Sequence, residues 1–271
     1  MREFRRIRVR AIVTSMIAAI IQARMGSERF PGKVAKDILG KPMLQHEIER
    51  LKTAKLVDKV LVATTDKQKD DAVAEIATMS GVEYFRGSEK DVLHRFYEAA
   101  VSSNADVVVR VTGDCPLHDP DVLDLVVRRF RDMGVDYAKT PANYPEGLDT
   151  EVFSFTALEL ANKNARLPSE REHVTPYLRN HPEMFKLDYE WTLGDFNHSS
   201  YHWSVDTAED FWFVEKVYEY LYKKGSVFHM QDIVALLKAR PELTEINKGG
   251  TGYEGLEKSR LEDEKFMKHH G

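Results

Sequence analysis

The feature that most constrains the fold is a regular alternation of short apolar segments with amphipathic ones across the first half of the chain. Each apolar segment is nearly continuous in Val, Ile, Ala or aromatic residues, as expected of a strand covered on both faces. The predicted strands are residues 17–23, 59–65, 82–86, 106–112 and 135–140. The predicted helices are residues 43–54, 69–80, 92–103 and 120–133. Such alternation predicts right-handed βαβ units and a parallel sheet, an α/β fold.

The boundaries of these helices carry local signals. Pro42 precedes the first helix, and Gly81 and Gly134 follow the second and the fourth. Asp119 and Pro120 give the fourth helix a capping side chain and a proline at its first position. The predicted helices therefore begin and end at residues that favour helix starts and helix ends.

Beyond about residue 141 the alternation is less regular. The predicted strands here are residues 151–155, 185–193 and 202–205, and the predicted helices are 157–165, 171–180, 209–223 and 230–239. Residues 247–271 contain glycines and many charges and are expected to lie on the surface or to be mobile. The simplest organisation is one domain at 16–245, with a carboxy-terminal lobe from about 141 and a tail at 246–271.

The amino terminus has two interpretations. Arginines followed by a short apolar run are typical of a secretory signal. We favour a basic leader at 1–15 followed by a buried strand, because Arg24 continues directly into a predicted phosphate-binding turn. Cleavage after Ala23 would remove the strand that holds this turn, and Met16 is an alternative start. No apolar run is long enough to span a bilayer, so no membrane partner is expected.

Charge and cysteine content exclude further classes. The net charge of −5 argues against a general nucleic-acid-binding protein, which usually carries a basic excess. Cys115 is the single cysteine, so the chain cannot form an internal disulfide or a cage of thiolate ligands. This content fits a reducing compartment, and we expect a cytoplasmic protein.

The segment after the first predicted strand is rich in cations and glycine. Its glycines allow the backbone to approach oxygen atoms, and Arg24, Arg29 and Lys33 can neutralise a polyphosphate. It matches neither of the common Gly-rich phosphate motifs, and a solvated basic loop is the alternative. We favour phosphate binding for the whole segment, Gln22-Ala23-Arg24-Met25-Gly26-Ser27-Glu28-Arg29-Phe30-Pro31-Gly32-Lys33.

Two predicted strands end on aspartates. Asp114 follows Thr112 and Gly113, and ligands of open α/β sheets bind beyond the carboxyl ends of strands where the strand order reverses. A carboxylate facing bound polyphosphate needs a cation between them, and Mg²⁺ is the natural choice. The alternative is that Asp114 caps a turn. Asp206 is a candidate second carboxylate, although on its own it is more simply part of a helix entry.

Two later segments, 145–153 and 169–175, carry clustered charges. The second places Arg171, Glu172 and His173 in a predicted first helical turn. A solvated helix start explains such a run, and so does a wall that binds substrate. The sequence alone does not separate these two interpretations.

Together and in this order, these segments resemble the cytidylyltransferase family, which includes the 3-deoxy-manno-octulosonate and acylneuraminate cytidylyltransferases. The most similar branch is that of spore coat polysaccharide biosynthesis protein F. The resemblance covers roughly residues 17–221, and its most specific parts are 22–33, 86–93, 112–117 and 171–175. It implies a Rossmann-like, doubly wound, mostly parallel sheet of the nucleotide-diphospho-sugar transferase type with a carboxy-terminal lobe. Because the family often dimerises, it also implies a homodimer.

The resemblance implies a role for each matching residue. The implied catalytic residues are Arg24, Lys33, Asp114 and Asp206, of which Asp114 and Asp206 would hold Mg²⁺. The implied nucleotide-binding residues are Arg24, Gly26, Ser27, Arg29, Lys33, Arg86, Asp91, Thr112 and Gly113. The implied substrate-binding residues are Asp149, Glu151, Arg171, Glu172 and His173. The sialic-acid and octulosonate enzymes have different residues around the acceptor, so the acceptor here need not be a 2-keto sugar acid.

The expected function is transfer of CMP from CTP to a sugar or sugar-acid hydroxyl, with release of pyrophosphate, in surface polysaccharide or glycan biosynthesis. One alternative is a glycosyltransferase of related fold that uses a nucleotide sugar. Such enzymes favour Asp-x-Asp, whereas Cys115 and Pro116 follow Asp114 here. A second alternative is a non-catalytic nucleotide-binding protein, against which the cationic loop and both aspartates argue. The base of the nucleotide and the identity of the sugar-like acceptor stay open.

Overall fold

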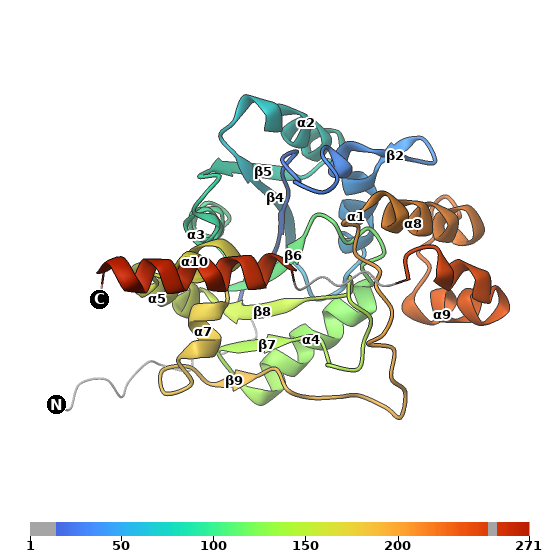
Figure 1. The fold of residues 1–271 in the computed structure, drawn as a ribbon. Helices are drawn as coiled ribbons and strands as arrows, with labels where there is room; N and C mark the ends of the chain where they lie inside the picture. Colours follow the sequence, from blue (N-terminus) through green and yellow to red (C-terminus); the bar gives the residue numbers. More distant parts are fainter. Residues whose placement is uncertain (1–14, 249–253, 271) are drawn as a thin grey trace.

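A twisted seven-stranded sheet forms the centre of the computed structural model, which describes residues 15–248 and 254–270 (Figure 1). The strand order is β5-β4-β1-β6-β8-β7-β9. β8 runs antiparallel to both of its neighbours, and the other pairs are parallel, so the sheet is mostly parallel as predicted. The strands are β1 (Ile17–Gln22), β4 (Lys59–Thr65), β5 (Glu83–Gly87), β6 (Val107–Thr112), β7 (Tyr137–Lys139), β8 (Glu151–Ser154) and β9 (Leu187–Asp188).

Helices cover both faces of this sheet. Ile17, Ala19 and Ile21 of β1 belong to a core shared with α1, α2 and α4, whereas Ala18 and Ile20 belong to a core shared with α3 and α5. Because successive side chains of a strand point to opposite faces, this division confirms the doubly wound arrangement. The helices are α1 (Met43–Leu51), α2 (Asp71–Met79), α3 (Val92–Ser102), α4 (Pro120–Met133) and α5 (Phe155–Asn164).

The strand order reverses at β1 and β6. β1 leads outward to β4 and β5 on one side, and the chain then returns to place β6 on the other side of β1. Gln22 at the end of β1 is in register with Thr112 at the end of β6. The loop after β1 and the turn after β6 therefore start side by side, at the position where such sheets bind ligands.

The remaining elements surround this framework. Figure 1 shows α8 and α9 together on one side and α10 lying across the part of the molecule that holds α5 and α7. The short strands β2 (Asp37–Ile38) and β3 (Lys41–Pro42) pair with each other. The other elements are η2 (Lys33–Ala35), η3 (Gln68–Asp70), α6 (Pro168–His173), α7 (Pro176–Asn180), α8 (Ala208–Leu221), α9 (Met230–Ala239), η4 (Pro241–Glu245) and α10 (Glu254–His270).

Three predictions for the second half were wrong. The predicted strand 185–193 is reduced to β9, since residues 189–201 form an irregular segment held by side chains such as Asn143, which donates to Leu193 O and Phe196 O. Residues 202–205 form no named strand, only an isolated bridge between Glu146 and His202. The predicted helix 171–180 is divided into α6 and α7, because Val174 has a φ of 72°.

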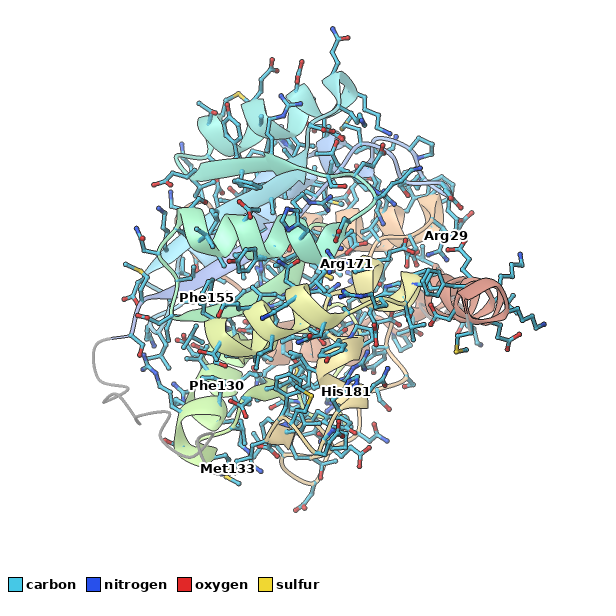
Figure 2. The ribbon with its side chains drawn as sticks, turned by 90° about the vertical axis from the view of Figure 1, so that its left-hand side faces the viewer. Arg29, Phe130, Met133, Phe155, Arg171 and His181 are labelled. Carbon is cyan, nitrogen blue, oxygen red and sulfur yellow. The ribbon has the colours of Figure 1, made fainter. Side chains whose placement is uncertain are left out.

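The structure describes a helix near the carboxy terminus and a strand that begins soon after the amino terminus. Most of the predicted leader, residues 1–14, lies outside the described residues, and the apolar run after it forms β1 as predicted. Within the predicted tail, residues 254–270 form α10, which packs against α6 and which Figure 2 views nearly along its axis. No helix in the described part of the chain has the length and apolarity that a membrane span requires.

Candidate active site

The loop after β1 is held in place by a buried carboxylate. Asp70 is fully buried, accepts a hydrogen bond of 2.6 Å from Met25 N, and also accepts one from the Thr65 hydroxyl. Gly32 closes the loop with a φ of 72° and donates to Met25 O at 2.9 Å. These contacts fix the backbone from which the cationic side chains project.

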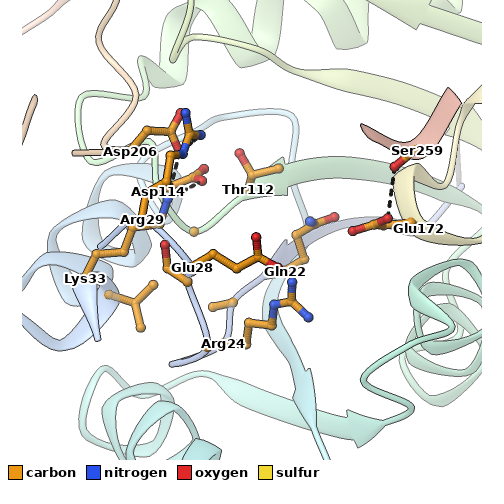
Figure 3. Close-up of a pocket in the computed structure, with 15 residues that line it drawn as sticks. Gln22, Arg24, Glu28, Arg29, Lys33, Thr112, Asp114, Glu172, Asp206 and Ser259 are labelled. Atoms are coloured by element: carbon orange, nitrogen blue, oxygen red, sulfur yellow. Dashed lines mark hydrogen bonds and ion pairs between the residues drawn. The ribbon is translucent and has the colours of Figure 1, made fainter. Parts of the chain in front are cut away.

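Lys33 lies between the two predicted metal carboxylates (Figure 3). Its Nζ atom is 2.9 Å from Asp114 Oδ2, 3.2 Å from Asp206 Oδ1 and 2.6 Å from Val205 O. Arg29 Nη2 is 2.9 Å from the same oxygen of Asp206. Two carboxylates and two cationic side chains from three separate segments therefore converge at one point.

Lys33 and Asp114 stay charged although both are at least partly buried, because each lies beside a group of opposite charge. Burial opposes the charge on Lys33, but the carboxylates of Asp114 and Asp206 outweigh it and raise the pKa of the ammonium group. Burial likewise opposes the charge on Asp114, but the Lys33 ammonium outweighs it and lowers the pKa of that carboxyl. Lys33 and Asp114 are therefore both charged around neutral pH.

Close backbone contacts set the positions of both aspartates. Gly113 N donates to Gln22 O at 2.8 Å, and a Cβ atom on Gly113 would lie 2.9 Å from Ala23 Cβ. Val205 N donates to Asp114 O at 2.8 Å, which joins the turn after β6 directly to the segment that carries Asp206. Tertiary contact, and not a predicted strand, brings Asp206 to the site.

The helix entry after Asp206 forms as predicted. The Thr207 hydroxyl accepts from Asp210 N at 3.3 Å, and Asp210 Oδ2 accepts from Thr207 N at 2.8 Å, which is a capping box with aspartate in place of the usual Glu or Gln. Asp210 Oδ2 also accepts from Asp206 N at 3.0 Å. The cap therefore orients the candidate carboxylate as well as the helix.

The imidazole of His202, in the segment that leads to Asp206, has a strongly raised pKa. Burial opposes its charge, but hydrogen bonds and ion pairs with Asp210 and Glu146 outweigh burial and raise its pKa from 6.5 to about 10. Burial also opposes the charge on Asp210, but His202 is the largest of the groups that lower the pKa of that carboxyl, to about 2.

His202 should therefore make stability depend on alkaline pH. A raised folded-state pKa contributes stability that is fully present below 6.5 and is lost as pH rises through about 10. Between pH 6 and pH 10 the free energy of unfolding should fall by roughly 2–4 kcal/mol in the native chain and much less in His202→Gln. Urea unfolding at both pH values measures this, and parallel declines in the two proteins would contradict it.

A cleft of about 440 Å³ surrounds the Lys33 cluster. Most of the predicted catalytic and nucleotide-binding side chains line it, which brings together the two sites that the sequence placed on separate segments. The predicted residues that line it are Arg24, Gly26, Ser27, Arg29, Lys33, Thr112, Gly113, Asp114, Glu172 and Asp206. The other lining residues are Gln22, Ala23 and Glu28, which belong to the predicted phosphate-binding segment but have no individual predicted role, and Val34 and Ser259, which lie outside the predicted segments.

Two predicted nucleotide-binding residues lie away from this cleft. Arg86 donates to Thr65 O at 2.9 Å and to Lys67 O at 2.8 Å, and it forms an ion pair with Asp71. Asp91 is the N-cap of α3 and forms an ion pair with Arg171. Neither residue is among those that line the cleft, so their nucleotide-binding role stays a prediction.

Of the residues predicted to bind the acceptor, one lines the cleft and the others do not. Glu172 lines the cleft, whereas Asp149, Glu151, Arg171 and His173 do not. Figure 2 shows Arg171 in the region of α6 and α10.

Glu151 is an acceptor-side group whose side chain is only 12% exposed. Burial opposes its charge, but Arg110 and Arg179 outweigh it and lower its pKa to about 2. Hydrogen bonds from Tyr137 and Thr175 complete the network. These partners hold Glu151 in one place, and its predicted role in substrate binding stays a prediction.

The sequence could have indicated some of the missed residues but not others. Gln22 is the last residue of β1 and the first of the predicted phosphate-binding segment, so its position at the carboxyl end of the strand is a usable signal for a role of its own. Ser259 lies in a charged segment without a motif, and only its packing against α6 brings it to the cleft.

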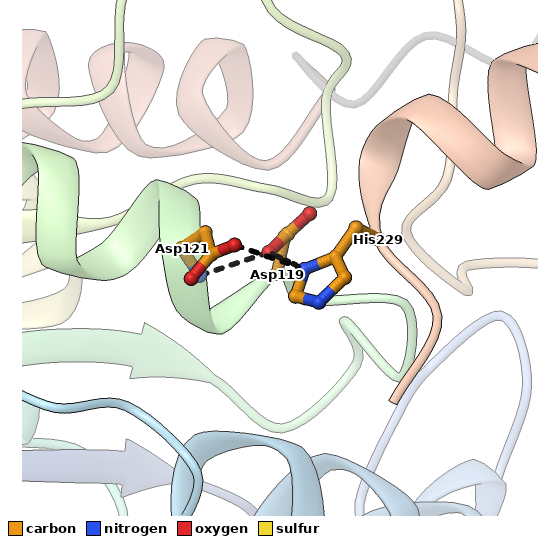
Figure 4. A group of neighbouring side chains, drawn as sticks. All are labelled: Asp119, Asp121 and His229. Carbon is orange, nitrogen blue, oxygen red and sulfur yellow. Dashed lines mark hydrogen bonds and ion pairs between the residues drawn. The ribbon is translucent and has the colours of Figure 1, made fainter. Parts of the chain in front are cut away.

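Another group of side chains is close enough to share a cation (Figure 4). The group comprises Asp119, Asp121 and His229. Asp119 is almost fully buried and accepts from Asp121 N at 2.9 Å, His229 Nδ1 at 3.0 Å and Met230 N at 2.6 Å. Because these donors already satisfy the Asp119 carboxylate at the starts of α4 and α9, we interpret the group as a helix cap.

The fold and this site together define a class. A mostly parallel sheet whose switch point carries a cationic loop and two converging carboxylates is the architecture of a nucleotidyltransferase. The comparisons then identify the family. Residues 18–246 match the family model described as Cytidylyltransferase, so the chain belongs to the cytidylyltransferase family.

Individual relatives agree with this membership. The chain is 40% identical over 233 residues to an uncharacterized protein of Methanocaldococcus jannaschii, covering 85% of this chain and 94% of that protein. It is 32% identical over 231 residues to a spore coat polysaccharide biosynthesis protein of Bacillus subtilis, covering 83% and 95%. A solved cytidylyltransferase structure from Leptospira borgpetersenii is 35% identical with a TM-score of 0.80, covering 89% of this chain and 100% of that one. The predicted fold and family are thus confirmed, and the family transfers CMP from CTP.

Proposed function

We propose that this protein transfers CMP from CTP to a hydroxyl of a sugar or sugar acid, with release of pyrophosphate, and that the reaction depends on Mg²⁺. The observation that carries the proposal is the placement of Lys33 between Asp114 and Asp206 at the switch point of the sheet. The likeness to a protein of spore coat polysaccharide biosynthesis supports a role in making surface polysaccharide or another glycan.

The residues at the cluster fit a magnesium ion. Asp114 and Asp206 direct carboxylate oxygens toward the same point, where a positive charge already lies at 2.9 and 3.2 Å. Mg²⁺ in nucleotide enzymes is held by one or two carboxylates together with phosphate oxygens. When bound there, the ion would neutralise phosphate charge and lower the pKa of the attacking hydroxyl.

The chain's own side chains supply the rest of the chemistry. Arg24, Arg29 and Lys33 line one cleft and would bind the β- and γ-phosphates, which leave together as pyrophosphate. An acceptor hydroxyl attacks the α-phosphorus in line, the bond to the bridging oxygen breaks, and negative charge accumulates on the leaving group. Because little covalent work falls to the protein, positioning and neutralisation of charge dominate.

Replacing Lys33 by methionine should reduce kcat by roughly 10²–10³-fold, because a charged contact to the leaving group is lost. The affinity for CTP, measured by calorimetry, should fall as well. Lys36→Met is the matched control, since Lys36 Nζ lies 4.6 Å above the Phe30 ring instead of between carboxylates. Equal kcat values in the two variants would argue against the proposed role of Lys33.

The direct test is a nucleotide screen with detection of pyrophosphate. CTP, UTP, ATP and GTP are each combined with Mg²⁺ and a panel of mannose, N-acetylglucosamine, N-acetylneuraminate and 3-deoxy-manno-octulosonate. We expect pyrophosphate with CTP and an acceptor, and none after chelation by EDTA. A glycosyltransferase would instead consume a nucleotide sugar without releasing pyrophosphate, and a non-catalytic protein would bind CTP without turnover.

A further inference from the structure

One end of the cleft is built by α10, which follows the part of the chain that the family shares. The family match ends at residue 246, whereas α10 spans Glu254–His270. Ser259 of α10 lines the cleft together with Glu172 of α6. Figure 3 shows this pair at the opposite end of the cleft from Asp114 and Asp206. A helix outside the shared region therefore contributes to the cavity.

A buried carboxylate fixes α10 against α6. Asp263 is 8% exposed and accepts hydrogen bonds from Ser169 N at 2.9 Å and from the Ser169 hydroxyl at 2.5 Å. Ser169 is buried too, so neither group has water as a substitute partner. Leaving such a carboxylate unpaired is costly, and the contact therefore sets the position of α10 along α6.

Ser259 stands one turn before Asp263 and binds two neighbouring side chains of α6. Its Oγ atom is 3.0 Å from Glu172 Oε2 and 2.9 Å from His173 Nε2. The serine hydroxyl donates to Glu172, and because a hydroxyl has only one proton to donate, it accepts from the His173 Nε2–H. Ser259 is only 2% exposed, whereas Glu172 is exposed to the cleft. A buried hydroxyl thus restrains a carboxylate that would otherwise rotate freely.

Gln22 also lines the cleft and lies between its two ends in Figure 3. Its Oε1 atom accepts from Arg110 Nε at 3.2 Å and from Nη2 at 3.1 Å, which identifies the other amide atom as the nitrogen that can donate. The cleft therefore presents an amide donor and a carboxylate acceptor, the pair of groups that recognises hydroxyls.

We infer that Ser259 is a positioning residue for the acceptor. It holds Glu172 so that this carboxylate accepts a hydrogen bond from a hydroxyl of a polyhydroxylated acceptor, and the charge of Glu172 disfavours a carboxylate at that end of the acceptor. The inference rests on the proposed function, since the acceptor is the substrate of that reaction. It assigns to α10 a part in choosing the substrate.

The test compares Ser259→Ala with the native chain, using CTP and each member of the acceptor panel named above. Loss of the restraining hydrogen bond should raise the KM for the acceptor roughly 5- to 10-fold, with kcat and the KM for CTP changed less than about twofold. Ser259→Thr keeps the hydroxyl and should restore the native KM. Glu262→Ala, at an exposed position of the same helix, is the matched control.

Hydrogen exchange provides a measurement that needs no acceptor. Amides of residues 171–173 should exchange faster in Ser259→Ala than in the native chain or in Ser259→Thr. An unchanged acceptor KM or unchanged exchange would overturn the inference, and so would a parallel loss of CTP affinity and kcat, which indicates general damage. If the native chain releases no pyrophosphate with any acceptor, the proposed function fails, while exchange still decides whether Ser259 holds α6.

Discussion

Asp114→Ala should abolish measurable pyrophosphate release while leaving the protein folded. Asp114 lies on the turn after β6 and contributes one of the two carboxylates that converge on the Lys33 ammonium. Its removal takes away a candidate magnesium ligand and leaves Lys33 with Asp206 and a backbone carbonyl. Losing one such charged contact typically costs about 10²–10³ in rate, and loss of the ion would add to this.

Rates of pyrophosphate release and circular dichroism spectra together decide this prediction. Asp132→Ala, on the exposed side of α4, removes the same charge far from any predicted ligand role and should keep native activity. Asp114→Asn keeps the size of the side chain but not its charge, and we expect it to be as inactive as the alanine variant. Near-normal Mg²⁺-dependent activity in either Asp114 variant would refute the metal assignment.

Gly147→Ala should destabilise the fold more than the same change at the other glycines whose surroundings the structure describes. Gly147 has a φ of 94°, and a Cβ atom there would lie 2.6 Å from Ser204 N and 2.6 Å from the Trp203 carbonyl carbon. Both neighbours are backbone atoms, so neither can rotate away. Positive φ and this clash together should lower the free energy of unfolding by more than about 3 kcal/mol.

Gly225→Ala separates the two causes of that loss. Gly225 also has a positive φ, of 80°, but nothing lies within 4 Å of its Cβ position, so only backbone strain of about 1–2 kcal/mol is expected. Urea unfolding compares the variants. In Gly147→Ala the segment that leads to Asp206 is displaced, so activity should fall even at temperatures where the protein stays folded. Equal stability of the two variants would contradict the close packing at Gly147.

How far the sequence predicts the structure depends on the range of the interactions. The elements of the first half are predicted well, because the strands β1, β4 and β6 are buried on both faces and each helix is bounded by its own proline, glycine or cap. The predicted strand 59–65 and the predicted helix 120–133 match β4 and α4. The elements of the second half are predicted less well. Residues 189–201, for example, are held by hydrogen bonds of side chains such as Asn143 and Trp191 instead of by the backbone hydrogen bonds of a strand.

The residues of the candidate site also differ in how well the sequence predicts their positions. Arg24, Arg29, Lys33 and Asp114 stand directly after strands that the sequence predicts, so their meeting at one edge of the sheet follows from the alternating pattern. Arg86 and Asp91 have the right chemistry, but they have partners elsewhere and are not among the residues that line the cleft.

By itself, the sequence determined the doubly wound sheet, the family, and the cationic loop with its first aspartate, since strand periodicity and motif spacing are local properties. Only the tertiary structure brought Asp206 to Lys33, which bonds to a carbonyl 172 positions away, and only α10 packing brought Ser259 to Glu172. Such contacts depend on how whole elements pack against one another. The family resemblance implied the position of Asp206 without giving its physical cause, and nothing in the sequence implied the position of Ser259.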